Sequence, residues 1–362
     1  MRIKLVILFI INNIIVFAQE KNDYSPKFSG YVRAWHQTEF NSYRQDQGQF
    51  LIKQARIAIT GAVNAYASYK FQVDFTRLGK LNTTTTTMQN QQVLTAASAS
   101  FSDILLDAQA IITPIKDFDI SAGQFKVPFG TDNLRADQNA DFANRPLLTG
   151  VSPSIRDIGL MFSYKFSAPF KAELHTGTFN GAGLNKIENN KTMDYVVRAV
   201  ISPVSNLNLS GNYYIGKQSV HSDPNSEVQF YNFGADYKLS NLFLDAEYGN
   251  KKANMDITVD KTHYYTDKTF KSFTGASFFA YATYRIPTGK EIIKDIIPAI
   301  RYEKYNPNTY FIEEEIEVVT MGLTFQFAKI SYAHLRINYE IFNTFEKRLH
   351  PDKLILELQT RF

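Results

Sequence analysis

The sequence predicts an all-β protein, a transmembrane antiparallel β-barrel of about sixteen strands with short periplasmic turns and long external loops. Three features predict it: apolar and polar residues alternate along most of the chain, the chain ends on the strand-like run LILELQTRF, and long connectors alternate with short ones. Successive side chains of a strand point to opposite faces, so such a strand contacts lipid on one side and water on the other. In AYASYKFQVDFT, one face carries Tyr69, Phe71, Val73 and Phe75, and the other carries Ser68, Lys70, Gln72 and Asp74.

The bulk composition fits this fold class. Aromatic residues make up 14% of the chain, whereas the mean hydropathy is only −0.24. Beyond the N-terminus no run approaches the roughly 20 apolar residues of a membrane helix, while a barrel strand needs only alternate residues to be apolar. The alternation alone also fits a soluble β-sandwich. Cysteine is absent, which excludes disulfides, thiolate metal sites and a cysteine nucleophile.

The N-terminus predicts export. Arg2 and Lys4 form a charged region, residues 5–17 an apolar core, and Ala18 a small residue before the expected cleavage site. We therefore expect residues 1–18 to be a signal peptide and residues 19–362 to form the barrel, in the outer membrane of a Gram-negative cell. Cleavage lowers the formal charge from +4 to +2 by removing two basic residues, so the net charge indicates no polyanionic partner and we expect no nucleic-acid binding.

Sixteen strands follow from the alternation, an even number as in bacterial barrels. Their predicted centres are Val32, Ile57, Val73, Ala108, Ala122, Leu160, Leu174, Val197, Leu209, Phe233, Ala246, Ala280, Ile300, Leu323, Ile337 and Leu358.

The connectors support the barrel over the sandwich. If the first strand rises from the periplasm, every long connector is external and Phe362 returns to the periplasmic side, a parity that a soluble sandwich does not require. The predicted long connectors are 40–49, 78–100, 128–156, 180–193, 217–227, 251–272, 306–315 and 345–352. The short ones are 61–64, 114–117, 167–169, 203–206, 240–241, 287–295 and 328–329.

Two motifs carry a family resemblance. GQFKVPFG (residues 123–130) and SPSIRDIGLMF (residues 152–162), with the polar loop between them, resemble the phosphate-selective porin O/P family of Bacteroidota-type outer-membrane porins. The resemblance implies a sixteen-stranded, generally trimeric barrel whose third external loop, 128–156, narrows the lumen, and the family name implies phosphate selectivity. Within the first motif we expect Gln124 and Lys126 to face inward, and Phe125 and Val127 to face lipid.

Charged residues on the inward faces nearly balance in sign, and they form no obvious arginine ladder. A balanced lumen favours a weakly selective, water-filled pore. Local order is still expected: a basic wall from the first five strands faces acidic residues of the third loop across the pore. The alternative is that these charges pair with lumen neighbours. The candidate pore-lining and constriction residues are Arg33, Arg56, Lys70, Lys126, Asp132, Asp137, Asp141 and Arg145.

These features predict a passive diffusion channel for small hydrophilic solutes or ions, with an anion- or phosphate-selective channel as the alternative. A non-conducting surface receptor or adhesin and a barrel enzyme are the alternatives of other classes. No GxSxG or HExxH pattern marks a catalytic group, and Glu313–Glu315 with Glu317 lack the spacing of a dedicated cation site. We expect no catalytic residue, metal or cofactor, and as partners outer-membrane lipid, lipopolysaccharide, the solutes and two further copies in a homotrimer.

Overall fold

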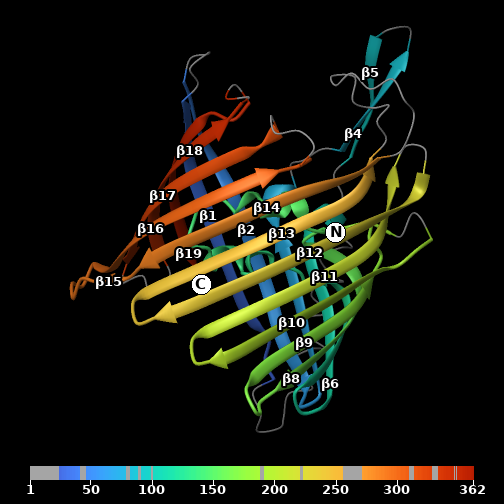
Figure 1. Cartoon of the computed structure of the whole chain (residues 1–362), viewed down its shortest axis with the longest axis horizontal. Coiled ribbons are helices and arrows are strands. Elements are labelled where there is room, and N and C mark those ends of the chain that lie inside the picture. Colours follow the sequence, from blue (N-terminus) through green and yellow to red (C-terminus); the bar gives the residue numbers. More distant parts are fainter. Residues whose placement is uncertain are drawn as a thin grey trace, which may run out of the picture.

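The strands of the computed structural model form a closed β-barrel (Figure 1). The structure describes residues 24–40, 46–78, 82–88, 91–98, 101–187, 191–220, 223–255, 271–309, 314–327, 333–345, 347 and 349–362. The sheet holds seventeen strands, but β14 and β15 are separated by Arg285 alone and both pair with β16, so the wall has sixteen positions. The described strands pair in antiparallel fashion, and β1 pairs with β19 to close the ring. The predicted fold class is confirmed.

Each of the sixteen predicted centres lies in a different wall strand. The wall strands are β1 (Lys27–Phe40), β2 (Gln47–Asn64), β3 (Ala67–Asp74), β6 (Leu105–Ile115), β7 (Phe118–Lys126), β8 (Arg156–Phe166), β9 (Lys171–Phe179), β10 (Asp194–Val204), β11 (Leu207–Val220), β12 (Asp223–Leu239), β13 (Leu242–Met255), β14 (Lys271–Tyr284), β15 (Ile286–Pro287), β16 (Ile293–Asn306), β17 (Ile316–Phe327), β18 (Ala333–Thr344) and β19 (Asp352–Arg361).

Two predicted connectors contain more strand than expected. The connector 78–100 includes a separate hairpin of β4 (Asn82–Met88) and β5 (Gln91–Ser98), which projects from the barrel in Figure 1. The connector 217–227 is largely paired, because β11 and β12 continue to Val220 and Asp223. Polar composition marks where a strand leaves lipid, whereas backbone pairing continues beyond that point.

The helical segments in the described part of the chain are short. They are η2 (Phe75–Arg77), α2 (Phe101–Ile104), α3 (Thr131–Leu134), η3 (Asp137–Asn139) and η4 (Leu147–Val151). No helix in the described part of the chain is long and apolar enough to cross a membrane.

The chain end completes the ring. The backbone N–H of Gly30 donates to the carbonyl of Phe362 at 3.1 Å, and the Phe362 N–H donates back at 3.0 Å. The terminal phenyl ring packs over Gly30, where any larger side chain would collide with it. The predicted closing strand is thus paired up to the last residue.

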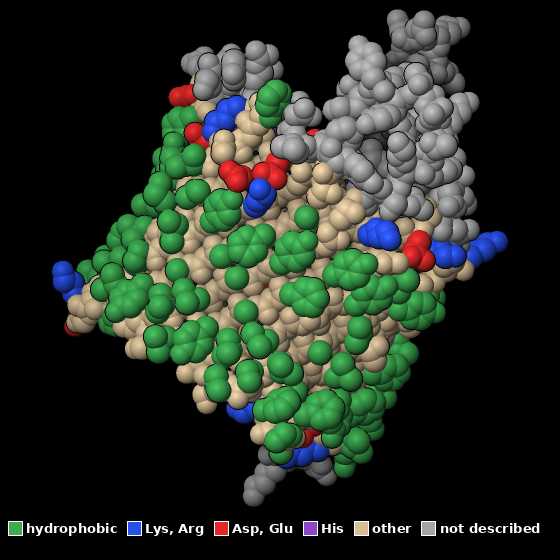
Figure 2. Space-filling model, viewed as in Figure 1, with side chains coloured by type: hydrophobic (Ala, Val, Ile, Leu, Met, Phe, Trp, Pro, Cys, Tyr) green, Lys and Arg blue, Asp and Glu red, His purple; other side chains and the backbone are tan. Residues whose placement is uncertain are grey.

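The two faces of the wall differ as the alternation predicts. On β12, Val228, Phe230 and Asn232 are buried within the barrel, whereas the outward Phe233 is 62% exposed. In Figure 2, hydrophobic side chains spread across the outer face and the charged ones gather toward its ends. A band of this kind matches the apolar surface that a barrel presents to lipid.

Candidate functional site

The connector between β7 and β8, residues 127–155, folds into the barrel; we call it the lumen loop. The backbone N–H of Thr131 donates to Glu247 Oε2 of β13 at 3.0 Å. The N–H of Ala143 donates to Asn338 Oδ1 of β18 at 2.6 Å. Because β13 and β18 lie far from β7 around the ring, the loop crosses the lumen between them. Its start is further fixed by Arg198, whose Nη2 donates to Thr131 Oγ1 at 3.0 Å.

Glycine in the first motif allows β7 to approach β6 closely near the end of the strand. Gly123 has φ +116°, a conformation that L side chains rarely adopt, and a Cβ there would overlap the carbonyl oxygen of Ala108 on β6. Gly130, at φ +74°, directly precedes α3.

Replacing Gly123 with alanine is therefore expected to prevent formation of the folded barrel, since both the backbone conformation and the space are lost. Gly211→Ala is the matched control, because a Cβ at Gly211 meets only the Phe233 ring at 3.8 Å. Gel migration of unheated and heated samples after refolding in detergent measures the folded fraction. Equal folding of both variants would contradict this account of the motif.

The prediction that Phe125 and Val127 face lipid is wrong. Their side chains are 3% and 2% exposed and belong to one apolar cluster with Phe129 and inward residues of β9 to β13. The Phe129 ring lies edge-on to Tyr214 and Phe230, at centroid distances of 6.4 and 6.2 Å. Phe125 still pairs with Asp157 of β8 and lies on the same strand face as the buried Ser121, so it points into the barrel, and Val127 begins the lumen loop.

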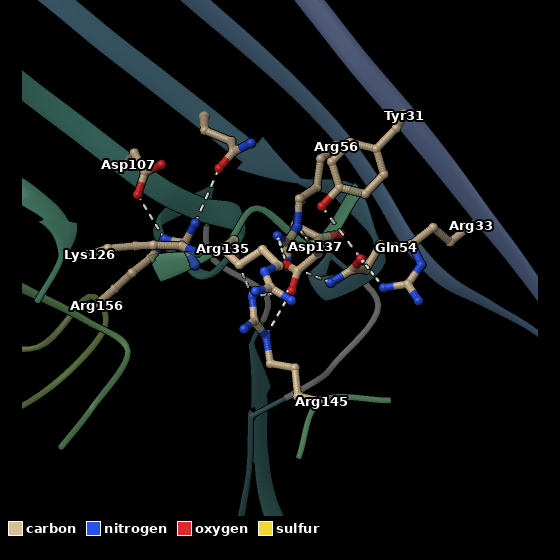
Figure 3. Close-up of polar contacts among 12 residues, drawn as sticks. Tyr31, Arg33, Gln54, Arg56, Asp107, Lys126, Arg135, Asp137, Arg145 and Arg156 are labelled. Atoms are coloured by element: carbon tan, nitrogen blue, oxygen red, sulfur yellow. Dashed lines mark hydrogen bonds and ion pairs between the residues drawn. The ribbon is translucent and has the colours of Figure 1, made fainter. Parts of the chain in front are cut away.

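Asp137 is the centre of the charged contacts of the lumen loop (Figure 3). Its carboxylate accepts hydrogen bonds from Arg56 Nη1 of β2, from Arg145 Nε at 2.9 Å and from Gln54 Nε2 at 3.0 Å. Burial alone would raise the pKa of the Asp137 carboxyl, but the guanidinium groups of Arg56 and Arg145 outweigh it and hold the pKa well below its usual range. Asp137 therefore links the loop to β2 as a charged group.

The other predicted basic residues are also held by partners. Arg33 Nε donates to Glu357 Oε2 of β19 at 2.9 Å, and Lys70 Nζ lies 2.7 Å from Asp107 Oδ2 of β6. Lys126 Nζ instead donates to two carbonyl oxygens of the lumen loop, at 2.8 and 2.7 Å.

The loop acids pair within the loop and with the far wall. Asp132 lies 3.0 Å from Arg145 Nη1. Asp141 lies 3.2 Å from Arg135 Nη1 and accepts from the Tyr281 hydroxyl of β14 at 2.8 Å. Contrary to the expectation of two walls opposed across open water, the structure has direct ion pairs. Any field in the pore must come from charges that these pairs leave in excess.

Above the lumen loop, on the side of the long connectors, lies a cavity of about 750 Å³ that we call the external vestibule. The loop residues Asp137 and Arg145 line it together with side chains from both flanks of the ring. Eight Lys and Arg side chains line it against three carboxylates. The cations are Arg33, Lys53, Arg56, Arg77, Arg145, Arg156, Arg301 and Lys353; the carboxylates are Asp137, Glu303 and Glu340.

Further carboxylates lie behind the arginines. Asp74 accepts from Arg56 Nε at 2.8 Å, and Asp107 accepts from Arg156 Nε at 2.7 Å, but neither acid lines the vestibule. These bonds leave Nη2 of Arg56 and Nη1 of Arg156 without a hydrogen bond to any described residue, and Arg77 makes no ion pair within that part of the chain. The cavity thus presents uncommitted guanidinium donors.

A family model described as phosphate-selective porin O and P matches residues 34–222, which are 189 of the 362 residues. The chain belongs to this family. It is an outer-membrane porin, and the sequence resemblance is confirmed. No curated protein matches the porin significantly.

Solved porins share its fold. The anion-selective porin of Comamonas acidovorans is 10% identical with a TM-score of 0.63, and the comparison covers 93% of this chain and 99% of that one. The high-pH structure of Pseudomonas putida OprB is 10% identical with a TM-score of 0.62, over 94% and 95% of the two chains. The trimer form of Vibrio cholerae OmpT is 11% identical with a TM-score of 0.54, over 93% and 99%.

Several residues of the porin's vestibule were not among the sequence candidates. Arg156 lies inside the second motif, and this position in the sequence could have marked it as a candidate residue. Arg77 and Lys53 lie where strands meet long connectors, and nothing local distinguishes them. No group of three or more potential metal ligands occurs in the described part of the barrel.

Proposed function

We propose that this porin is a passive diffusion channel that favours anions, with the external vestibule as its selective region. The excess of eight cationic over three acidic side chains round that cavity carries the proposal. A pore ringed by one sign of charge selects the opposite ion. The lumen-wide balance seen in the sequence conceals this excess, because the neutralising carboxylates stand behind the arginines.

The narrow part of the channel is proposed to be the lumen loop, predicted from the sequence as residues 128–156. Its own charged residues and Arg33, Arg56 and Lys126 hold it in place, whereas Lys70 pairs within the wall. Asp137 bonded to Arg56, and Arg145 bonded to Asp132 and Asp137, support this role. A rigid loop keeps the pore cross-section constant, which a sieve requires. Transport would follow the concentration gradient, without a cofactor.

We further propose a homotrimer in the outer membrane, in contact with lipid and lipopolysaccharide, made from a precursor whose residues 1–18 are removed on export. The fold shared with a porin solved in a trimer form supports the assembly. The signal peptide lies outside the described residues.

We propose that the barrel is not an enzyme. One Ser–His–Glu arrangement occurs on neighbouring strands: Ser163 Oγ lies 2.8 Å from His175 Nδ1, and Glu173 lies 3.4 Å from the other ring nitrogen. Ser163 is only 6% exposed, so its hydroxyl offers little access to a substrate. The arrangement is better explained as a cross-strand polar contact.

Neutralising two vestibule cations, the exposed Lys53 and the half-buried Arg77, tests the anion preference. In the double variant Lys53→Gln/Arg77→Gln, the anion-to-cation permeability ratio is expected to fall about fivefold. Each lost charge attracts a passing anion by roughly 0.5 kcal/mol in a high-dielectric, water-filled pore. Zero-current potentials under a KCl gradient measure the ratio.

The matched control is Lys304→Gln on the outer face of β16, where Lys304 pairs with Glu315 at 2.7 Å. Dissolved salt at 0.1 M screens an exposed charge beyond about 10 Å, so a charge on the outer face has little effect on ions inside the pore. The permeability ratio should therefore not change. An unchanged ratio in the double variant would contradict the assignment of selectivity to the vestibule.

A further inference from the structure

The external vestibule has apolar as well as basic lining. Leu147 and Ile155 of the lumen loop, and Leu184 of the connector between β9 and β10, are half-buried and line the cavity. The buried side chains of Leu106 and Val318 also line the cavity. The cavity therefore offers guanidinium groups and hydrocarbon surface to the same occupant.

This combination is unnecessary for a hydrated inorganic ion. Apolar surface facing water is unfavourable, by roughly 25 cal/mol for each Å² that a ligand or the protein could cover. Selection of a bare anion needs only the charged ring. Hydrocarbon next to that ring becomes useful when the permeating solute has an apolar part to place against it.

The size of the cavity also favours a solute with an organic body. Its volume of about 750 Å³ lies in the range of roughly 300–1,000 Å³ that is typical of sites for organic ligands. An inorganic oxyanion fills only a small part of such a space. An anion with an organic body fills more of it and contacts both kinds of lining.

We infer that the external vestibule binds an amphipathic organic anion, a carboxylate or phosphate monoester with an apolar body, in preference to an inorganic anion. The inference rests on the proposed anion channel and specifies its substrate class. The anionic head lies against Arg56, Arg77 and Arg156, whose planar donor groups match carboxylate and phosphate oxygens. The apolar body lies against Leu147 and Leu184.

Block of the KCl current tests the inference. Phenyl phosphate, inorganic phosphate and benzyl alcohol are added in turn to both chambers of a planar bilayer holding the wild-type protein. The half-blocking concentration of phenyl phosphate is expected to be about tenfold below that of inorganic phosphate, and benzyl alcohol should not block, because both the charge and the ring are required.

Leu184→Gln removes apolar lining without changing charge. It is expected to raise the half-blocking concentration of phenyl phosphate about fivefold and to leave that of inorganic phosphate unchanged. Ile187→Gln is the matched control: it changes the same connector at a side chain that is 84% exposed and does not line the cavity.

The outcomes separate the two proposals. Anion-selective current with equal or tighter block by inorganic phosphate, or equal effects of Leu184→Gln and Ile187→Gln, would overturn the inference and leave the proposed function standing. Cation-selective current would overturn both. Tighter block by phenyl phosphate that depends on Leu184 supports the inference.

Discussion

Replacing Glu357 with glutamine is expected to destabilise the barrel by about 3–5 kcal/mol, the usual result of removing one partner from a buried ion pair. Glu357 is fully buried and binds two guanidinium groups, those of Arg33 on β1 and Arg336 on β18, each 3% exposed. It also accepts from the Trp35 indole N–H at 2.7 Å. The variant leaves two buried cations facing a neutral amide where the first and last strands meet.

The temperature at which β-structure is lost in detergent, followed by circular dichroism, measures this effect. Glu39→Gln is the matched control, because Glu39 lies 3.6 Å from Lys353 in a partly exposed pair. Such pairs contribute about 0–1 kcal/mol. Equal melting temperatures for Glu357→Gln and the wild type would refute the view that this carboxylate holds the first and last strands of the barrel together.

The second large effect is expected from Asp137→Asn. Loss of the charge weakens the link between the lumen loop and β2, because Arg56 and Arg145 lose their shared counter-ion. The expected destabilisation of the docked loop is again about 3–5 kcal/mol. Removing one of the three vestibule carboxylates also strengthens the anion preference.

Single-channel recording measures both consequences of Asp137→Asn. The open-state current should become visibly noisier than the wild-type current, and the zero-current potential should move further in the anion direction. Asp141→Asn is the control in the same loop. Its partner Arg135 retains a second counter-ion, because Arg135 Nη2 lies 2.5 Å from Asp245 Oδ2. Steady currents from both variants would show that the Asp137 link does not hold the loop.

The same link has a defined pH dependence. Because the pKa of Asp137 is lowered in the folded protein, its stabilising contribution is fully present above the ordinary aspartate pKa of about 3.9. It is lost only as the pH falls through the depressed value. The effect of Asp137→Asn on current noise should therefore be the same at pH 5 as at pH 7.

The wall was predictable because each strand carries its own signal. Lipid on one side and protein or water on the other impose the period of two on every segment, so the strand centres follow from local sequence. The period does not reveal that Phe125 and Val127 pack into a cluster inside the barrel. That cluster includes Tyr214 and Phe230, which lie many residues away in the sequence.

The charged site was less predictable because its pairs are distant in sequence. Arg33 and Glu357 are 324 residues apart, and Arg56 and Asp137 are 81 apart. Counting charges by strand face predicts which charged residues point inward but not which residues they pair with. Only the fold separates the cations that line the vestibule from the carboxylates that stand behind them.

The most direct test of the central claim is the zero-current potential of the wild-type protein in a planar bilayer under a KCl gradient. An excess of cationic side chains in the external vestibule predicts a potential whose sign shows chloride to be more permeant than potassium. A potential of the opposite sign would contradict the account.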